Sequence, residues 1–307
     1  MKLDEKTWEE IFRDIFKGEV NFMESMRNHT SLKIGGPADV FVMPEDISSL
    51  KNLLIALKKE GIPFLPLGGG TNVLIKDEGT EGVVINLNSF KKIEILNDDE
   101  KYVNLYVEAG TSAQRLVSFS REKGYSGIEW LAGIPGTVGG AIAGNAGAFG
   151  YEIKDVIISV WIINSDGVLT KLITKEIDFG YRRSGISQKE LIIAAEITLK
   201  KDNEEDVSMR INDFLRKRKE RQPIGQLSAG CVFKNPPDLS AGKLIDDAGC
   251  KGMRVGDVEV SNVHANFFIN RGKANASDFL RLMERVINRV KEISGIILEP
   301  EIRIIGR

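Results

Sequence analysis

Two glycine-rich loops are the segments of this sequence whose residue types and spacing could bind a charged ligand. Residues 67–72 have the sequence Leu-Gly-Gly-Gly-Thr-Asn, and residues 133–147 begin Gly-Ile-Pro-Gly-Thr-Val-Gly-Gly-Ala. Glycine lets several backbone N–H groups converge on a pyrophosphate without clashes from Cβ atoms. Either loop alone is most simply a tight turn or a close packing contact. Two such loops in one chain favour a dinucleotide cofactor.

Neither loop matches the common nucleotide-binding motifs. The sequence contains no GxxxxGK followed by Ser or Thr, and neither loop combines GxGxxG with a helix and a following acidic residue. This disfavours a nucleotide hydrolase and a simple NAD-binding Rossmann domain. We therefore expect the dinucleotide to be held by a different fold.

The elements that position these loops alternate irregularly between helices and strands. A helix over residues 46–60 has leucines at helical spacing, acids at its start and lysines at its end. A strand over residues 62–67 leads into the first loop, and a helix over 111–123 precedes the second. Further strands are predicted over residues 83–87, 103–108, 156–163, 191–199, 231–233, 266–269 and 301–305, and further helices over 1–17, 207–221, 241–248 and 276–294. The order predicts a mixed α+β fold, with an acidic linker at residues 202–206.

Composition excludes several classes of protein. Hydrophobic residues make up 42% and charged residues 28%, which is ordinary for a globular chain, and the net charge is −2. This charge gives no overall attraction to nucleic acids or acidic membranes. The acidic N-terminus lacks the features of a signal peptide, and the longest apolar run is too short to span a membrane. We therefore expect a cytoplasmic protein that neither binds nucleic acid nor inserts into a membrane.

Cysteine and histidine are too sparse to suggest a metal centre. Cys231, Cys250, His29 and His264 are the only residues of these two types, and no CxxC motif occurs. A structural zinc site is disfavoured, and no metal is expected. One disulfide stays open, although a chain of this size has little need of it.

Six short motifs occur between residue 28 and the C-terminus. They cover residues 28–38 (NHTSLKIGGPA), 67–74 (LGGGTNVL), 133–147, 179–184 (FGYRRS), 228–236 (SAGCVFKNP) and 298–303 (LEPEIR). Together, and in this order, they resemble the UDP-N-acetylenolpyruvoylglucosamine reductase (UDP-N-acetylmuramate dehydrogenase) family. The resemblance implies an α+β fold with an FAD-binding domain of the vanillyl-alcohol-oxidase (PCMH) type in two subdomains, followed by a C-terminal α+β substrate domain.

The resemblance also implies domain boundaries and a reaction. The FAD subdomains would be residues 1–82 and 83–203 and the substrate domain 204–299, with a strand at 300–307 returning to the first subdomain. NADPH would reduce bound FAD and leave, and UDP-N-acetylglucosamine enolpyruvate would then bind in the same place. Hydride from flavin N5 would add to C3 of the enolpyruvyl group, and a proton would arrive at C2. The product, UDP-N-acetylmuramate, is a peptidoglycan precursor, so the implied role is in cell wall biogenesis, cell shape and cell division.

Three residues match the family's catalytic positions. Hydride addition pushes negative charge onto the substrate carboxylate, which the planar guanidinium of Arg182 would stabilise. Glu301 matches the acid beside that carboxylate, where it would donate a hydrogen bond or orient Arg182. Cys231 stands where the family commonly has the serine that donates the C2 proton, and a thiol with a pKa of about 8.5 can do the same. Each residue also has a purely structural alternative. Arg182 could be a surface arginine, Glu301 could form an ion pair at a strand edge, and Cys231 could be a buried structural cysteine.

The resemblance and local spacing assign the remaining site residues. Strand alternation puts Arg303 on the same face as Glu301, and Arg218 and Arg221 share a helix face. For His264, a position in the core and a contact with the substrate are equally compatible with the sequence. The expected cofactor-binding residues are Leu67, Gly68, Gly69, Gly70, Thr71, Asn72, Gly133, Ile134, Pro135, Gly136, Thr137, Gly139, Gly140, Ala141, Asn145, Gly147 and Arg218. The expected substrate-binding residues are Tyr181, Arg221, Lys234, Asn235, His264 and Arg303.

The segment after the Tyr-Arg motif bears on the subgroup. Only a short segment separates Ser184 from a strand that begins near Ile192, and no tyrosine follows Tyr181. This favours the short-loop (type II) subgroup, which has no tyrosine-bearing loop over the substrate. Two other functions stay open: an FAD-dependent alcohol oxidase or dehydrogenase of the same fold, and a non-catalytic module that binds FAD or a sugar nucleotide. The chain is expected to be a monomer whose partner is a small-molecule sugar nucleotide.

Overall fold

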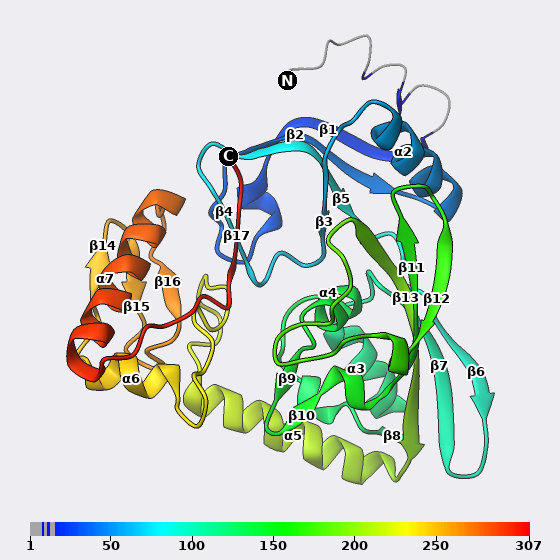
Figure 1. Ribbon diagram of the computed structural model, residues 1–307. Helices are drawn as coiled ribbons and strands as arrows, with labels where there is room; N and C mark the ends of the chain where they lie inside the picture. Colours follow the sequence, from blue (N-terminus) through cyan, green and yellow to red (C-terminus); the bar gives the residue numbers. More distant parts are fainter. Residues whose placement is uncertain (1–7, 9–10, 13–15) are drawn as a thin grey trace. The chain divides into compact units, whose positions relative to one another are not determined.

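The computed structural model describes residues 8, 11, 12 and 16–307 (Figure 1). The chain forms two compact units. The first unit lies within residues 1–22, 40–69 and 82–215, and the second unit comprises residues 23–39, 70–81 and 216–307. The three domains expected from the sequence are defined by the ligand that each would bind. The two compact units do not test that division, which stays a prediction.

The N-terminal helix expected over residues 1–17 is described only in part. Trp8, Ile11 and Phe12 are helical, whereas Ile15 lies outside the described residues. The rings of Trp8 and Phe12 stack with their centroids 5.9 Å apart. These three residues are the described part of the apolar side that the sequence predicts for this helix.

A long antiparallel sheet dominates the first unit. Its strands are β6 (Ile93–Asp98), β7 (Tyr102–Glu108), β8 (Tyr125–Ser126), β11 (Ile157–Asn164), β12 (Leu169–Ile173) and β13 (Glu190–Lys201). The order is β12-β11-β13-β7-β6, and β8 pairs with β13. Along β7, Val103, Leu105 and Val107 are buried and alternate with more exposed residues, which fits a sheet with one face on a core.

Short helices and strands fill the segment between β7 and β11. They are α3 (Ala113–Glu122), η2 (Glu129–Leu131), α4 (Val138–Ala143), β9 (Gly147–Ala148), β10 (Tyr151–Glu152) and η3 (Ile153–Asp155), and η4 (Thr174–Glu176) follows β12. Ser112 caps α3 by accepting a hydrogen bond from the Arg115 amide, and Thr137 caps α4 in the same way from Gly140. Both caps are polar side chains that bond to the first free amides of their helices, and α4 lies within the second glycine loop.

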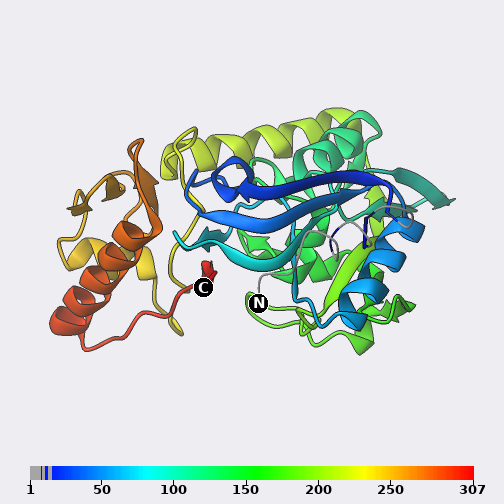
Figure 2. The ribbon, with the colours of Figure 1, turned by 90° about the horizontal axis from the view of Figure 1, so that it is seen from above.

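A second sheet carries the chain into the first glycine loop. Its strands are β1 (Gly18–Ser25), β2 (Pro37–Pro44), β3 (Phe64–Leu67) and β5 (Thr80–Asn86), in the order β1-β2-β5-β3. The strands β1 and β2 lie side by side in Figure 2. Helix α2 (Ile47–Lys59) follows β2, is capped by Asp46, and buries the four leucines of its predicted apolar stripe: Leu50, Leu53, Leu54 and Leu57.

Helix α5 (Glu204–Arg221) begins where the sequence suggested a linker. Glu204, Glu205 and Asp206 form its first turn, where negative charge is favourable at the positive end of the helix dipole. The linker expectation is therefore wrong. The compact units divide within α5 itself, after Leu215.

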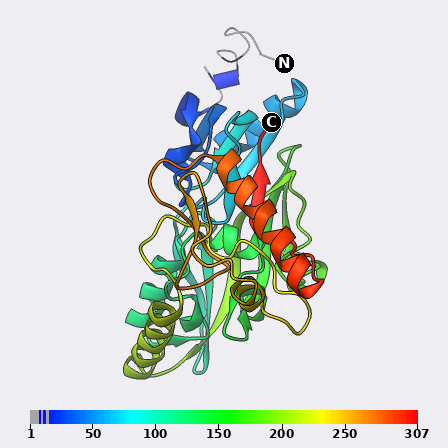
Figure 3. The ribbon, with the colours of Figure 1, turned by 90° about the vertical axis from the view of Figure 1, so that its left-hand side faces the viewer.

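The second unit has its own core. It contains η1 (Met26–His29), β4 (Val73–Ile75), α6 (Ala241–Asp247), β14 (Arg254–Val255), β15 (Val258–Val260), β16 (Phe268–Asn270), α7 (Ala276–Ser294) and β17 (Arg303–Ile305). The rings of Phe233, Phe268 and Phe279 are fully buried and pack in sequence, at centroid distances of 6.0 and 5.3 Å. Figure 3 shows α7 as one unbroken helix, and its observed ends agree with the predicted ones. Gly295 ends it in the left-handed conformation, with φ of 74°.

Three strands expected in the second unit are shorter than predicted, and the one expected over 266–269 is observed as β16. Residues 231–233 form no continuous strand; Cys231 pairs with Phe267 and Phe233 pairs with Pro300 as isolated bridges. The C-terminal strand begins at Arg303 rather than Glu301, and it runs parallel to β4. The reason is that the amides of residues 301 and 302 both donate to the Val232 carbonyl instead of joining the strand ladder.

Two further findings bear on the expected class of protein. No helix among the described residues is long and apolar enough to cross a membrane. Cys231 and Cys250 do not form a disulfide with each other within the part of the chain that the structure describes.

Candidate active site

The first unit contains a cavity of about 400 Å³ at the two glycine loops. Four residues expected to bind the cofactor meet in its wall. They are Gly69 from the first loop and Pro135, Gly136 and Thr137 from the second. The remaining lining residues carry no glycine pattern and were missed by sequence reasoning: Asn88, Lys91, Gly110, Ser112, Gln114 and Arg115.

The glycines let these two loops approach each other closely. A Cβ placed on Gly68 would lie 2.6 Å from Oγ1 of Thr137, and one on Gly139 would lie 2.8 Å from Cβ of Ala109. Such distances are too short for real side chains, so a larger residue at 68 would push the two loops apart and one at 139 would push the second loop away from Ala109, which follows β7. The Gln114 side chain also donates to the carbonyl of Ile134, at 2.6 Å, and fixes the start of the second loop.

The lining of the cavity fits an anionic dinucleotide. Lys91 and Arg115 supply positive charge, while Ser112 and Thr137 supply hydroxyl groups. The fully buried Oγ1 of the adjacent Thr111 has no hydrogen-bond partner within the described part of the chain.

Asn86, the last residue of β5, fixes the first loop. This buried residue donates from Nδ2 to the Gly68 carbonyl, at 3.1 Å, and accepts from the Asn88 amide at 2.8 Å. It therefore joins a residue of the glycine loop to a residue that lines the cavity. Sequence reasoning missed Asn86 because it lies inside a strand with no motif around it.

Arg182 lies in a tight turn of the first unit. The Gly180 amide donates to the Arg183 carbonyl at 2.9 Å, and the Arg183 amide donates back to Gly180 at 3.2 Å. Arg182 itself has a φ of 59°, in the left-handed region that non-glycine residues rarely adopt. Its Nη1 donates to the Gly147 carbonyl at 3.1 Å, and its guanidinium lies 5.4 Å from the centre of the Tyr181 ring.

The neighbouring Arg183 has a different environment. Its Nη1 lies 3.0 Å from Oδ2 of Asp178, and both side chains are largely exposed. Arg183 therefore has the environment of an ordinary surface arginine, which is the alternative considered for Arg182. The structure thus separates the two adjacent arginines and leaves Arg182 as the one that returns to the second glycine loop.

Cys231 and Glu301 are brought together by backbone pairing in the second unit. The Val232 carbonyl accepts from the Glu301 amide at 2.8 Å and from the Ile302 amide at 3.3 Å. The Lys234 amide donates to the Glu299 carbonyl, also at 2.8 Å. Two segments that are about 70 residues apart therefore lie side by side, and each carries one predicted catalytic residue.

Asn72, from the end of the first glycine loop, joins the same group of segments. Its carbonyl accepts from the Arg303 amide at 3.1 Å, and its Nδ2 donates to the Glu301 carbonyl at 3.3 Å. Gly70 has a φ of 62°, and a Cβ there would lie 1.9 Å from the His29 carbonyl oxygen. The 70–72 part of the loop is thus fitted against the 28–38 motif and the C-terminal segment.

Asn266 holds the Cys231 segment from its other side. Its Oδ1 accepts from the Phe233 amide at 2.9 Å, and its Nδ2 donates to the Phe233 carbonyl at 2.8 Å. The Asn266 carbonyl also accepts from the Val232 amide. This buried side chain thus bonds to the backbone of Phe233 as a paired strand would.

His264 supports Asn266. Nδ1 of His264 accepts from the Asn266 amide at 3.2 Å, so the hydrogen-bond network assigns the ring proton to Nε2. Burial lowers the pKa of His264 from its ordinary value of 6.5. These contacts describe a neutral histidine that supports the Cys231 segment; the expected substrate contact stays a prediction.

Arg218 interacts electrostatically with Cys231. The side chain of Arg218 is only 5% exposed, on α5. Burial lowers its pKa, and the negative charge of a Cys231 thiolate opposes that shift. A cation therefore accompanies the predicted proton donor.

The other expected substrate-binding residues have varied surroundings. Lys234 Nζ lies 3.5 Å from Glu299 Oε2, and Asn235 Oδ1 accepts from the Ala241 amide at the start of α6. Tyr181 is 51% exposed. Arg221 and Arg303 are exposed.

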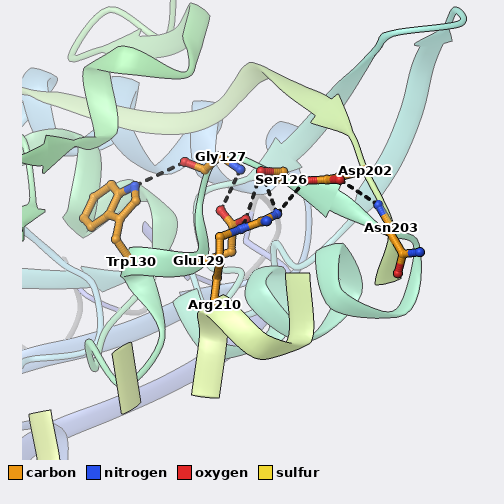
Figure 4. Close-up of polar contacts among 7 residues, drawn as sticks. All are labelled: Ser126, Gly127, Glu129, Trp130, Asp202, Asn203 and Arg210. Carbon is orange, nitrogen blue, oxygen red and sulfur yellow. Dashed lines mark hydrogen bonds and ion pairs between the residues drawn. The ribbon is translucent and has the colours of Figure 1, made fainter. Parts of the chain in front are cut away.

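An ion cluster around the buried Glu129 precedes the second glycine loop (Figure 4). Glu129 accepts from Arg210 Nε, from Ser126 Oγ and from the Gly127 amide, and Arg210 also pairs with Asp202. Burial acts to raise the pKa of Glu129, but these hydrogen bonds outweigh it and hold the pKa below 4.5. The cluster fastens α5 to η2 and was not visible in the sequence as a motif.

Two family models match most of the chain. One, described as UDP-N-acetylenolpyruvoylglucosamine reductase, C-terminal domain, matches residues 222–305. The other, described as FAD binding domain, matches residues 38–172. The expected fold class, an FAD-binding domain of this type followed by a C-terminal α+β domain, is confirmed.

Relatives of the chain match it over nearly their whole length. The UDP-N-acetylenolpyruvoylglucosamine reductase of Geotalea uraniireducens is 42% identical over 94% of this chain and 95% of its own. That of Syntrophus aciditrophicus is 39% identical over 97% of this chain and 95% of its own. The crystal structure of the Thermus caldophilus enzyme superposes with a TM-score of 0.81 at 35% identity, over 95% of this chain and all of that one.

Proposed function

Because this chain belongs to the UDP-N-acetylenolpyruvoylglucosamine reductase family, we propose a division of catalytic roles between named residues of its two units. The chain is an FAD-dependent oxidoreductase of peptidoglycan precursor synthesis. The proposed reaction converts UDP-N-acetylglucosamine enolpyruvate to UDP-N-acetylmuramate, with NADPH as the source of the hydride. A cytoplasmic location and a monomeric state are part of the same proposal.

The cavity of the first unit would hold the FAD. Hydride transfer is the chemistry that FAD would supply when bound there. Lys91 and Arg115 would neutralise the diphosphate, and the backbone of residues 67–70 and 133–137 would approach it closely. The charge of Lys91 and Arg115 and the hydroxyl groups of Ser112 and Thr137 in the lining support this.

Arg182 would stabilise the charge that develops on the substrate. When hydride adds at C3, the electron pair of the double bond moves toward C2 and onto the adjacent carboxylate. A guanidinium held in place before the reaction stabilises this charge without reorganising. The tight turn and the bond from Arg182 to Gly147 would supply that fixed position.

Cys231 would complete the reduction by donating its thiol proton to C2. The new C–H bond at C2 takes the electron pair left by hydride addition, and the thiolate that remains regains a proton from solvent. Arg218, whose charge interacts with that thiolate, would stabilise it in the meantime. Glu301, whose backbone is fixed by Asn72 and by the Val232 carbonyl, would donate a hydrogen bond to the substrate carboxylate from its protonated form or orient Arg182.

The segment after the turn supports the short-loop subgroup. Only residues 184–189, Ser-Gly-Ile-Ser-Gln-Lys, separate Arg183 from β13. This segment contains no aromatic residue and is too short to fold over a nucleotide. We therefore assign the chain to the type II subgroup, in which the site stays open on this side.

The observation that carries the assignment of roles is the pairing of the Cys231 and Glu301 segments with each other. The test is NADPH consumption by the purified flavoprotein with and without the enolpyruvyl substrate. Substrate-dependent consumption with formation of UDP-N-acetylmuramate is expected. Flavin reduction by an alcohol without NADPH would favour an oxidase, and flavin binding without any turnover would favour a non-catalytic module.

A further inference from the structure

We propose that Asn145 is a positioning residue for Arg182. The sequence placed Asn145 among the cofactor-binding residues, because it lies in the second glycine-rich segment. Its observed contacts lead to the turn that carries the arginine, and the cofactor contact stays a prediction. The proposal rests on the catalytic role proposed for Arg182, but the hold of Asn145 on the turn can be measured separately.

Both polar atoms of the Asn145 side chain are used inside the first unit. The residue is 0% exposed. Its Nδ2 donates to the Gly180 carbonyl at 3.0 Å, and its Oδ1 accepts from the Lys154 amide at 3.4 Å. The orientation of the amide is fixed by chemistry, because a carbonyl only accepts and a backbone N–H only donates.

The turn held by this bond is one that needs outside support. Gly180 and Arg183 close it with two backbone hydrogen bonds, and Arg182 takes a φ of 59° at its corner. A side chain larger than glycine is destabilised in this conformation and keeps it only where the surroundings fix it. Residues in such conformations often serve function, and here the residue is the predicted catalytic arginine.

Among the described residues, three hydrogen bonds lead from the turn to residues 143–147. Asn145 binds the Gly180 carbonyl, Ser184 Oγ donates to the Ala143 carbonyl at 3.1 Å, and Arg182 Nη1 donates to the Gly147 carbonyl. Asn145 is the one of these that reaches the backbone of the turn before Arg182. The second half of the glycine segment therefore acts as a frame for the arginine.

Asparagine is well suited to this position. Asn145 has a φ of 40°, which asparagine tolerates better than most residues because its short side chain bonds to nearby backbone. A donor and an acceptor on the same short side chain are both required here. Aspartate keeps the size and the acceptor for Lys154, but it would direct an oxygen at the Gly180 carbonyl.

The test compares the Asn145→Asp variant with the unchanged enzyme in three measurements. Formation of UDP-N-acetylmuramate should fall about 100-fold, which is the scale expected when a catalytic group is displaced by about 1 Å. Flavin reduction by NADPH alone should stay within about twofold, because it involves no substrate carboxylate. Hydrogen exchange of residues 179–184 should become faster, with the rest of the first unit unchanged.

Asn270 offers a matched control in the second unit. It is also buried, donates from Nδ2 to the Leu32 carbonyl at 2.8 Å, and accepts from the amides of Gly272 and Ala274. The Asn270→Asp variant makes the same chemical change at a segment without a predicted catalytic residue. It should lower stability without separating product formation from flavin reduction.

Several outcomes would overturn the proposal. Normal product formation by Asn145→Asp, an equal loss of both half-reactions, or unchanged exchange at residues 179–184 would each do so. If Asn145→Asp does not fold, Ser184→Ala decides the matter, since it removes another of the three bonds and should lower product formation about tenfold with flavin reduction kept. If the unchanged enzyme lacks substrate-dependent NADPH consumption, the proposed function fails, while the exchange measurement still tests the hold of Asn145 on the turn.

Discussion

The two units hold their predicted catalytic residues in contrasting ways. In the first unit, Asn145 bonds to two different segments and supports a turn in which Arg182 takes a left-handed conformation. In the second unit, Asn266 bonds twice to a single residue, Phe233, and extends an ordinary backbone pairing beside Cys231. The same side chain thus supports a strained turn in one case and a strand-like segment in the other.

This difference separates function from stability. The Arg182 turn is half-buried at Gly180 and Arg182 and exposed at Tyr181, so water can reach the Gly180 carbonyl when its bond to Asn145 is lost, while the arginine moves. Phe233 is fully buried in the core of the second unit, so a lost bond there leaves polar groups without water. We expect the turn to be sensitive in catalysis and the segment to be sensitive in folding.

The largest effect is expected from the proton donor of the second unit. Cys231→Ala should lower product formation about 1000-fold, because general acid catalysis contributes about 10²–10⁴ in rate. Flavin reduction by NADPH should continue, so the variant should accumulate reduced flavin in stopped-flow measurements. Cys231→Ser keeps a donor at the same place and should retain activity, with a pH profile shifted toward the alkaline side.

The contrast between these two variants also tests the role of the thiol. Normal turnover by Cys231→Ala would show that the C2 proton comes from another group. Loss of activity in both variants to the same degree would indicate that the thiol acts in packing, since serine could then not replace it.

The next effect compares the same substitution in the two units. Asn266→Asp should lower the free energy of unfolding by about 2–4 kcal/mol, since two buried hydrogen bonds to Phe233 are disturbed. Asn145→Asp should lower it by less, about 1–2 kcal/mol, because Asn145 is as buried as Asn266 but loses a single bond, the one to the half-buried Gly180 carbonyl. Urea unfolding of both variants measures the difference. Equal losses would contradict the distinction between a half-buried turn and a core segment.

How much of this could be read from the sequence depends on the range of the interaction. Helix α7 was predicted with its observed ends, because apolar spacing and Gly295 are local signals. The glycine loops and the motifs around Arg182 and Cys231 were also local. The acidic segment 202–206 was misread because acids mark both linkers and helix starts, and only the tertiary contacts of α5 decide between them.

The residues that fasten the site could not be read in this way. Asn145 reaches Gly180 and Asn266 reaches Phe233 across more than 30 residues of sequence. No periodicity records such a bond, so Asn145 was assigned to the cofactor and Asn266 was not singled out at all. Lys91 and Arg115 were missed for a similar reason, since a single charged residue looks the same on a surface and in a cavity wall.

The smallest effect concerns one carboxylate in each unit and depends on pH. Glu129 of the first unit has a pKa held below 4.5 by hydrogen bonds from Gly127, Arg210 and Ser126. Asp77 of the second unit has a pKa below 3.8, although burial acts to raise it, because the amides of Ala276 and Ser277 at the start of α7 donate to it. In each case the folded state favours the charged form.

The sign of the effect follows from linkage. A carboxylate with a lowered folded-state pKa stabilises the fold above its ordinary pKa, and this stability is lost as the pH falls through the folded value. Glu129→Gln should therefore cost about 1–3 kcal/mol at pH 7, and the difference from the unchanged protein should shrink below about pH 4. Asp77→Asn should cost about 1 kcal/mol, as for the loss of a charged helix cap. Urea unfolding at a series of pH values measures both, and a cost for Glu129→Gln that does not change with pH would mean that its charge contributes nothing to the cluster with Arg210.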